Sequence, residues 1–299
     1  MTPGDFAAIS ELLKRRSGLI LPPEKAYLLE SRLRPVMRKH ALADLSAVAA
    51  ALIRQDTRLA ADVIDAMTTN ETLFFRDVRP FDVFREVVLP ALLKARAAQR
   101  SFRILCAAAS TGQEPYSLAM ILAEEAARLR DWSCEIVGFD ISPTALERAR
   151  AGRFTQFEVQ RGVPTAQLLK HFRRVGTDWQ IAAELRAMVR FREFNLLDDL
   201  APFGRCDVVF CRNVLIYFDP ATKARTLANI VRRLPGDGYL FLGASETVMG
   251  LSGGFVPAAG CSGVYQPLAA RAAPSTPSVA PARRRWAKPP AAGADEAVG

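Results

Sequence analysis

Residues 102–117 read FRILCAAASTGQEPYS, and this stretch decides the fold. The apolar run 102–107 has the character of a short buried strand, and it ends in small residues. These small residues let a ligand approach the backbone closely, and Gly112 permits a tight turn. Glu114 and Pro115 then open a helix that we expect to run to residue 129. The stretch therefore predicts a strand–turn–helix unit with a ligand site at its turn.

The chain on either side repeats this alternation of strands and helices. Apolar runs predict further strands, and helical periodicity separates them. We expect strands at 134–139, 189–194, 207–211 and 239–243, and helices at 143–151 and 221–234. Strands that alternate with helices indicate an α/β fold with a doubly wound, mostly parallel sheet.

The rest of the chain divides into segments of different composition. Residues 1–76 predict a small all-α domain with a basic face, in which Asp44 caps a helix, and 77–98 predict a linker helix. Residues 99–268 form the α/β domain, with an insertion at 152–190 whose apolar side chains we expect to pack: Phe154, Phe157, Trp179 and Ile181. The Pro-, Ala- and Arg-rich residues 269–299 predict a disordered tail.

Composition excludes several classes of protein. The 299 residues carry a net charge of +9, and 50% are hydrophobic, which excludes a wholly disordered chain. No apolar run reaches the roughly 18 residues of a membrane span, and the N-terminus has no secretory pattern. Five scattered Cys and two His make disulfides, a metal site and a His-based triad poor interpretations, so we expect a cytoplasmic protein without a metal.

Polar residues follow the predicted strands, where an open parallel sheet binds its ligands. Glu114 would repel a phosphate and suits a cationic group, such as the ammonium of an amino acid. Asp140 could accept hydrogen bonds from ribose hydroxyls, or it could be the N-cap of the helix that starts near Pro143. Position alone leaves both interpretations of Asp140 open.

Three further segments can be interpreted either as parts of a ligand site or as ordinary packing and loops. Asn213 could bind a ligand amide or carboxylate and Tyr217 could present its phenol near the site, or the segment could be a core strand with Tyr217 as half-buried packing. Asn195 and Leu196 could flank an adenine ring or form a plain loop. Residues 67–77, MTTNETLFFRD, favour a packed linker when taken alone, because Phe pairs usually fill cores.

Taken together, these strings resemble the chemotaxis protein methyltransferases of the CheR family. The resemblance covers residues 5–268 and rests on strings in the family's order and spacing: NETLFFR (70–76), CAAASTGQEPYSLAM (106–120), FDIS (139–142), FNLL (194–197), FCRNVLIYFD (210–219) and LGASE (242–246). It implies a class I S-adenosylmethionine-dependent methyltransferase with a Rossmann-like sheet, an N-terminal all-α domain and an inserted β-subdomain. Gln113 and Ala244 depart from the family, which frequently has an acid and a His there.

The resemblance also implies a reaction and the residues that serve it. S-adenosylmethionine would donate a methyl group to a receptor glutamate, giving a γ-methyl ester and S-adenosylhomocysteine. Arg76 and Tyr217 match the residues near the acceptor and the transferred methyl. The cofactor-binding positions would be Asn70, Thr72, Arg76, Glu114, Asp140, Asn195, Leu196, Asn213 and Val214.

The same resemblance implies a binding partner for the basic N-terminal helices. Residues 14–39 hold eight Lys and Arg against two Glu, and we predict that Arg32, Arg34 and Arg38 dock on the acidic helical bundle of a methyl-accepting receptor. The alternative is a solvated surface. We expect a monomer that acts at receptor arrays without membrane insertion, and no RNA-binding or zinc-finger signature indicates nucleic acid. The β-subdomain binds a receptor peptide in some family members, and the sequence leaves this open.

Two other functions compete with receptor methylation. One is a class I methyltransferase that acts on another protein or a small molecule. The other is a non-enzymatic module that senses S-adenosylmethionine or its product. The set Arg76, Asp140, Asn213 and Tyr217 argues against the sensor.

Overall fold

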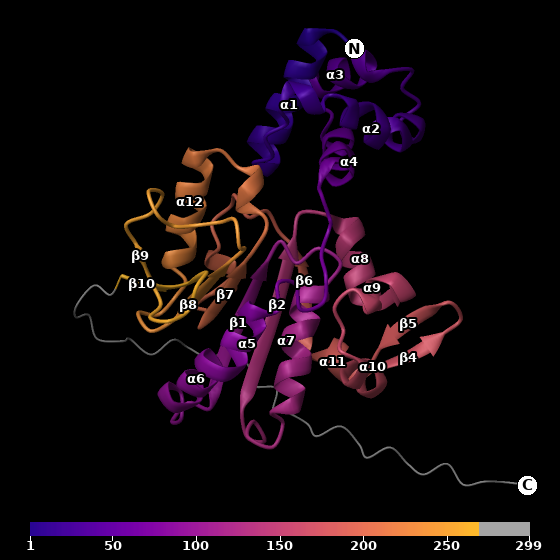
Figure 1. The fold of residues 1–299 in the computed structure, drawn as a ribbon. Coiled ribbons are helices and arrows are strands. Elements are labelled where there is room, and N and C mark those ends of the chain that lie inside the picture. The colour runs from indigo at the N-terminus through magenta and orange to yellow at the C-terminus, as the bar shows by residue number, and fades with distance from the viewer. Residues whose placement is uncertain (269–299) are drawn as a thin grey trace, which may run out of the picture.

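The computed structural model describes residues 1–268, and the prediction for 269–299 lies outside them (Figure 1). Four helices form the N-terminal domain: α1 (Pro3–Ser17), α2 (Tyr27–Lys39), α3 (Leu45–Ile53) and α4 (Thr57–Met67). Their apolar faces meet in one core that includes Ile9, Leu29 and Val63. The Asp44 side chain accepts the N–H of Ala47, so its predicted role as the N-cap of α3 is confirmed.

A seven-stranded sheet forms the second domain, in the order β6-β2-β1-β7-β8-β10-β9. The first five strands in this order are mutually parallel: β6 (Val189–Glu193), β2 (Ser133–Asp140), β1 (Ser101–Ala107), β7 (Val208–Cys211) and β8 (Tyr239–Leu242). The predicted doubly wound sheet is confirmed. Two antiparallel strands, β9 (Phe255–Pro257) and β10 (Val264–Pro267), escaped prediction because they are short and separated by a turn-rich segment.

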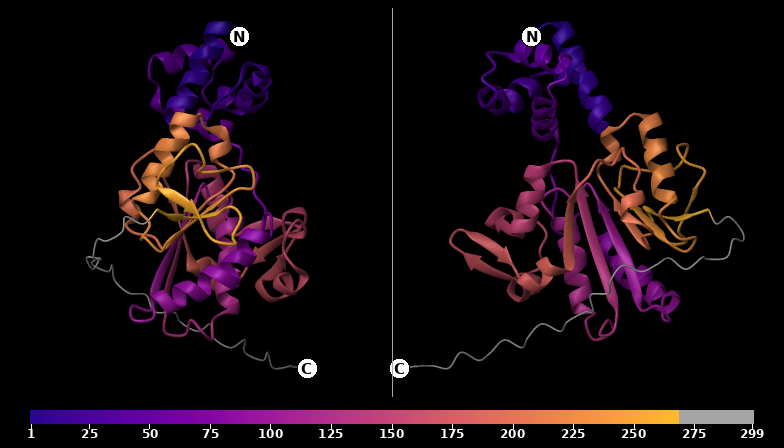
Figure 2. Two further views of the ribbon diagram at one scale, coloured as in Figure 1. Left: turned by 60° about the vertical axis from the view of Figure 1, so that its left-hand side comes forward. Right: turned by 180° about the vertical axis from the view of Figure 1, so that it is seen from behind.

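Helices cover both faces of this sheet, as Figure 2 shows. Helix α7 (Gln113–Glu124) packs on the face that carries Ile104, and α12 (Pro220–Val231) packs on the face that carries Leu105. Helix α8 (Pro143–Ala151) lies beside β2 and β6. The predicted α7 ran to residue 129, but a turn replaces the helix after Glu124.

The predicted linker helix 77–98 is interrupted. It consists of α5 (Arg79–Val83), a π-helical turn η2 (Phe84–Val88) and α6 (Leu89–Ala95). Asp77 and Val78 have positive φ values of 68° and 50°, so the helix starts only at Arg79. The widened turn lies just before Pro90, which has no N–H to bond to the preceding turn.

The insertion forms a small subdomain beside the sheet. Its strands follow the order β3-β5-β4, with three short helices around them: β3 (Arg153–Thr155), β4 (Phe172–Val175), β5 (Asp178–Ile181), α9 (Gln156–Gln160), α10 (Thr165–His171) and α11 (Ala183–Met188). Phe154 and Ile181 are buried, and Trp179 is half-buried. The prediction that Phe157 packs inside is wrong, because its side chain is 64% exposed and lies under the Arg161 guanidinium.

Two features bear on ligand and membrane binding. Of the helices within residues 1–268, none combines the length and apolar character needed to cross a bilayer. In the same residues, no three His, Cys, Asp or Glu side chains gather so that they could hold a metal ion.

Candidate functional site

A cavity lies at the carboxyl ends of β1, β2, β6 and β7. These strand ends point toward the N-terminal helices (Figure 1). Side chains from the linker (residues 67–77), the strand ends and the end of α1 line it together. All ten residues that the sequence singled out for the cofactor or the methyl group belong to this lining: Asn70, Thr72, Arg76, Glu114, Asp140, Asn195, Leu196, Asn213, Val214 and Tyr217. This is the edge at which open α/β sheets bind ligands.

The turn between β1 and α7 has an unusual backbone. Ala108, Ser110 and Gly112 all have positive φ, at 55°, 50° and 95°. A Cβ at position 112 would lie 3.1–3.2 Å from Tyr116 and Phe191, so the turn needs glycine for space as well as for conformation. Strained non-glycine residues at this turn are typical of a ligand site.

Asp140 is buried at the end of β2. Its Oδ2 accepts the N–H of Ser110 at 2.8 Å, and its Oδ1 accepts the N–H of Ser142 at 2.9 Å. The N-cap of α8 is Ser142, so the capping interpretation of Asp140 is wrong. Burial raises the pKa of the Asp140 carboxyl, and the backbone hydrogen bonds oppose that rise.

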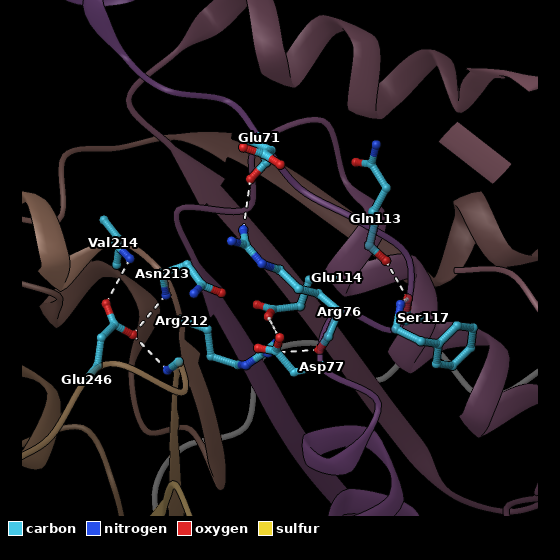
Figure 3. A network of polar contacts seen from close by, with 12 residues as sticks. Glu71, Arg76, Asp77, Gln113, Glu114, Ser117, Arg212, Asn213, Val214 and Glu246 are labelled. Atoms are coloured by element: carbon cyan, nitrogen blue, oxygen red, sulfur yellow. Dashed lines mark hydrogen bonds and ion pairs between the residues drawn. The ribbon is translucent and has the colours of Figure 1, made fainter. Parts of the chain in front are cut away.

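Glu114 forms a buried ion pair that the sequence analysis missed. Arg212, directly after β7, donates from Nη1 to Oε2 of Glu114 at 2.9 Å (Figure 3). Burial raises the pKa of the Glu114 carboxyl, while Arg212 and, less strongly, Arg76 lower it. The sequence held one indication of this pair. Arg212 directly follows the apolar strand DVVFC, and a charge buried at such a position needs a partner of opposite charge.

The linker enters the cavity along one side. Arg76 donates from Nη1 to the Glu71 carbonyl at 3.1 Å, and its own carbonyl accepts Nη2 of Arg212 at 2.8 Å. The Phe pair of this segment is buried: Phe74 packs on Phe154 and Phe172 of the inserted subdomain. The packing interpretation is therefore right for the Phe pair, while Arg76 faces the cavity.

Glu246, which the sequence analysis also missed, shapes the loop after β7. Its carboxylate accepts the N–H groups of Asn213, Val214 and Gly243 at 2.7–2.9 Å (Figure 3). Asn213 is held at a φ of 58°. A Cβ at position 243 would lie 2.7 Å from Oε2 of Glu246, so glycine is needed for this close approach. The acid thus fixes two of the predicted ligand-binding residues.

The end of α1 closes the cavity from the N-terminal domain. Ile20 donates its N–H to the Tyr217 carbonyl at 2.9 Å, and the Asn195 side-chain amide donates to the Arg16 carbonyl. Oδ1 of Asn195 accepts the Leu197 N–H at 3.0 Å. Asn195 therefore joins α1 to the sheet while it lines the cavity, and the neighbouring Leu196 is buried.

The three arginines singled out on α2 differ in their surroundings. Arg32 donates from Nη1 to the carbonyls of Met67 and Thr68 at 2.8 and 3.2 Å, so it caps the end of α4. Arg34 and Arg38 are exposed and form no ion pair within residues 1–268. The structure thus separates Arg32 from the other two.

Comparison with known proteins gives matches over most of the chain. Residues 4–68 match the model described as "CheR methyltransferase, all-alpha domain", and residues 70–260 match "CheR methyltransferase, SAM binding domain". The Chemotaxis protein methyltransferase 1 of Pseudomonas aeruginosa is 41% identical over 251 residues, covering 83% of this chain and 91% of its own. The Chemotaxis protein methyltransferase Cher2 of Pseudomonas putida is 39% identical, with the same two coverages, and the Chemotaxis protein methyltransferase of Vibrio parahaemolyticus is 38% identical, covering 84% and 92%.

Proposed function

This chain belongs to the CheR methyltransferase family, and we propose that its cavity holds S-adenosylmethionine while a receptor glutamate enters to accept the methyl group. The enzyme is a protein-glutamate O-methyltransferase of chemotaxis receptors, with a γ-methyl ester and S-adenosylhomocysteine as products. The observation that carries the proposed site is that the ten residues implied by the family resemblance, which come from distant parts of the sequence, all line one cavity.

The chemistry of the lining residues fits this donor. Oε1 of Glu114 takes part in no hydrogen bond within residues 1–268, so it can accept the donor's ammonium. Each carboxylate oxygen of Asp140 has one backbone partner and can accept a further hydrogen bond from a ribose hydroxyl. Leu196 and Val214 offer apolar contact for the adenine, beside Asn195 and Asn213. Asn70 and Thr72 cover the cavity from the linker.

The reaction asks little acid–base help from the protein. A glutamate side chain has a pKa of about 4.3 and is already an anionic nucleophile at neutral pH. When bound, the sulfonium donor supplies an activated methyl group with a good leaving group. The protein then has to align the carboxylate and exclude water, which is catalysis by positioning. We assign alignment of the incoming carboxylate to Arg76 and positioning of the methyl to Tyr217.

The exposed pair Arg34 and Arg38 supports a docking role for α2. The two residues are four apart and share a helix face. Long-range attraction would guide this face toward the glutamate-rich helices of a receptor. Arg32 contributes to docking indirectly. Its hydrogen bonds to the carbonyls of Met67 and Thr68 attach α2 to the end of α4.

One experiment distinguishes the proposed function from its alternatives. The full chain is incubated with S-adenosylmethionine labelled in the methyl group and with receptor-containing membranes. Label that enters the receptor and is released by mild base supports a glutamate ester. Base-stable label would indicate a different methyltransferase, and binding without transfer to any receptor would indicate a sensor.

A further inference from the structure

A second cavity, of about 510 Å³, lies at the β6 edge of the large sheet and shares no lining residue with the first. Its lining comes from β1, β2, β6, α7, α8, α11 and the segment around Phe203. Five arginines line it, against Glu135 as the one acid in the lining: Arg103, Arg150, Arg186, Arg190 and Arg192. The proposed methyl transfer does not use this cluster of positively charged side chains.

Only part of this charge is neutralised. Glu135 accepts Nε of Arg103 at 2.7 Å and Nη1 of Arg190 at 3.1 Å. The other three, Arg150, Arg186 and Arg192, have no carboxylate oxygen within 4 Å among residues 1–268. Arg150 donates to the Phe191 carbonyl at 3.3 Å, and Arg192 donates to the Pro202 carbonyl at 3.5 Å. Such long contacts leave most of their donors available.

Arg186 is the clearest sign of a missing partner. Its Nε is buried and makes no hydrogen bond within residues 1–268. It lies close enough to Tyr116 to lower the pKa of that phenol, although burial raises it more. A buried donor without an acceptor is unfavourable, and the guanidinium that carries it belongs to a side chain lining the cavity, where an anion could pair with it.

We propose that this cavity binds a small phosphate-bearing anion with at least two phosphate groups. Guanidinium groups form paired hydrogen bonds with phosphate oxygens, and several of them suit several phosphates. The volume lies in the range of small-molecule sites. The aromatic rings in the wall already pack on others, Phe191 on Tyr116 at 5.6 Å and Phe203 on Phe139 at 4.9 Å. The recognition is therefore of charge rather than of a stacked base.

An acidic peptide added to the β6 edge is the competing occupant. Addition of a strand needs free carbonyl and N–H groups along that edge. The Phe191 carbonyl in β6 already accepts Nη2 of Arg150, and both α8 and α11 contact β6. These contacts favour the small anion.

Isothermal titration of pyrophosphate into the full chain, at constant ionic strength, tests the proposal. Saturable binding is expected, and Arg150→Gln/Arg186→Gln/Arg192→Gln should weaken it at least about tenfold. The matched control Arg58→Gln/Arg130→Gln/Arg225→Gln removes three exposed arginines outside the cavity and should leave it unchanged. Binding of S-adenosylmethionine by both variants verifies that they are folded.

Three results would overturn the proposal. They are absence of saturable pyrophosphate binding, equal loss in the control variant, and tighter binding of hexaglutamate than of pyrophosphate. If the triple variant fails to fold, Arg192→Gln alone replaces it, because this side chain is exposed. Unchanged pyrophosphate affinity in Arg192→Gln would then count against the site.

Discussion

Arg212 and Glu114 form a buried ion pair, with Nη1 of Arg212 2.9 Å from Oε2 of Glu114. The Arg212 side chain is only 1% exposed, and its Nη2 also donates to Asp77 at 2.7 Å. One guanidinium therefore joins the end of β7, the start of α7 and the linker. It holds the carboxylate that we assign to the ammonium of the methyl donor.

Replacement of Arg212 should weaken donor binding and shift its pH dependence. In Arg212→Gln the pKa of Glu114 rises further, because burial is no longer opposed by the guanidinium. The ionised carboxylate is the form that binds an ammonium, so affinity falls as pH drops through this raised pKa. We expect the acid limb of donor binding to move to higher pH, and stability to fall by about 3–5 kcal/mol.

Titration of S-adenosylmethionine across a pH series, with a thermal melt at each pH, measures both effects. Arg212→Lys is the control, since it keeps a positive charge beside Glu114. An acid limb at the same pH in wild type and Arg212→Gln would contradict the assigned role.

Glu246 should act through the loop that it holds. Glu246→Gln replaces a carboxylate that accepts four backbone N–H groups, including that of Ile216 at 3.3 Å, so one oxygen is exchanged for an amide donor that opposes them. We expect stability to fall by about 1.5–3 kcal/mol and donor affinity to fall with it. Glu147→Gln on the exposed side of α8 is the control. Unchanged melting and affinity in Glu246→Gln would show that the loop holds its shape without the acid.

Arg76 and Tyr217 should affect turnover more than donor binding. Arg76→Ala removes the group that we expect to orient the acceptor carboxylate, and a misplaced acceptor costs about 10²-fold in rate. Tyr217→Phe should lower kcat and leave the Kd for S-adenosylmethionine near its wild-type value. Steady-state kinetics with receptor membranes, beside donor titration, separate the two. A wild-type kcat in both variants would contradict the roles that we assign to Arg76 and Tyr217.

The exposed face of α2 should govern receptor affinity. Arg34→Glu/Arg38→Glu should raise KM for the receptor and flatten its dependence on salt, because exposed charges act at long range and are screened. Arg130→Glu/Arg225→Glu makes the same charge change on the methyltransferase domain and should leave KM near wild type. Equal KM values for the two double variants would place docking elsewhere.

Local patterns predicted the elements that carry their own signal. The strand and turn at 102–117, the cap at Asp44 and the helix at Pro143–Ala151 all depend on neighbours in sequence. Topology then explains why Glu114, Asp140 and Asn213 meet, since parallel strands end at one edge.

The missed features depend on contacts between distant segments. Arg212 lies 98 residues from its partner Glu114, and Glu246 lies 33 residues from Asn213. No local periodicity encodes such pairs. Phe157 is a case in which a local pattern misled the prediction. Its apolar side chain suggested packing, but its position in α9 leaves it exposed. Strands β9 and β10 are too short for their alternation to stand out.

Mass spectrometry of receptor peptides after incubation with S-adenosylmethionine tests the central claim most directly. We predict methyl esters on receptor glutamates with the wild-type chain, and almost none with Asp140→Asn, whose side chain we assign to the donor's ribose. Asp131→Asn, which alters an exposed ion pair with Arg100 outside the cavity, should leave the esters in place. Absence of glutamate esters with the wild-type chain, or equal esters with Asp140→Asn, would contradict the account.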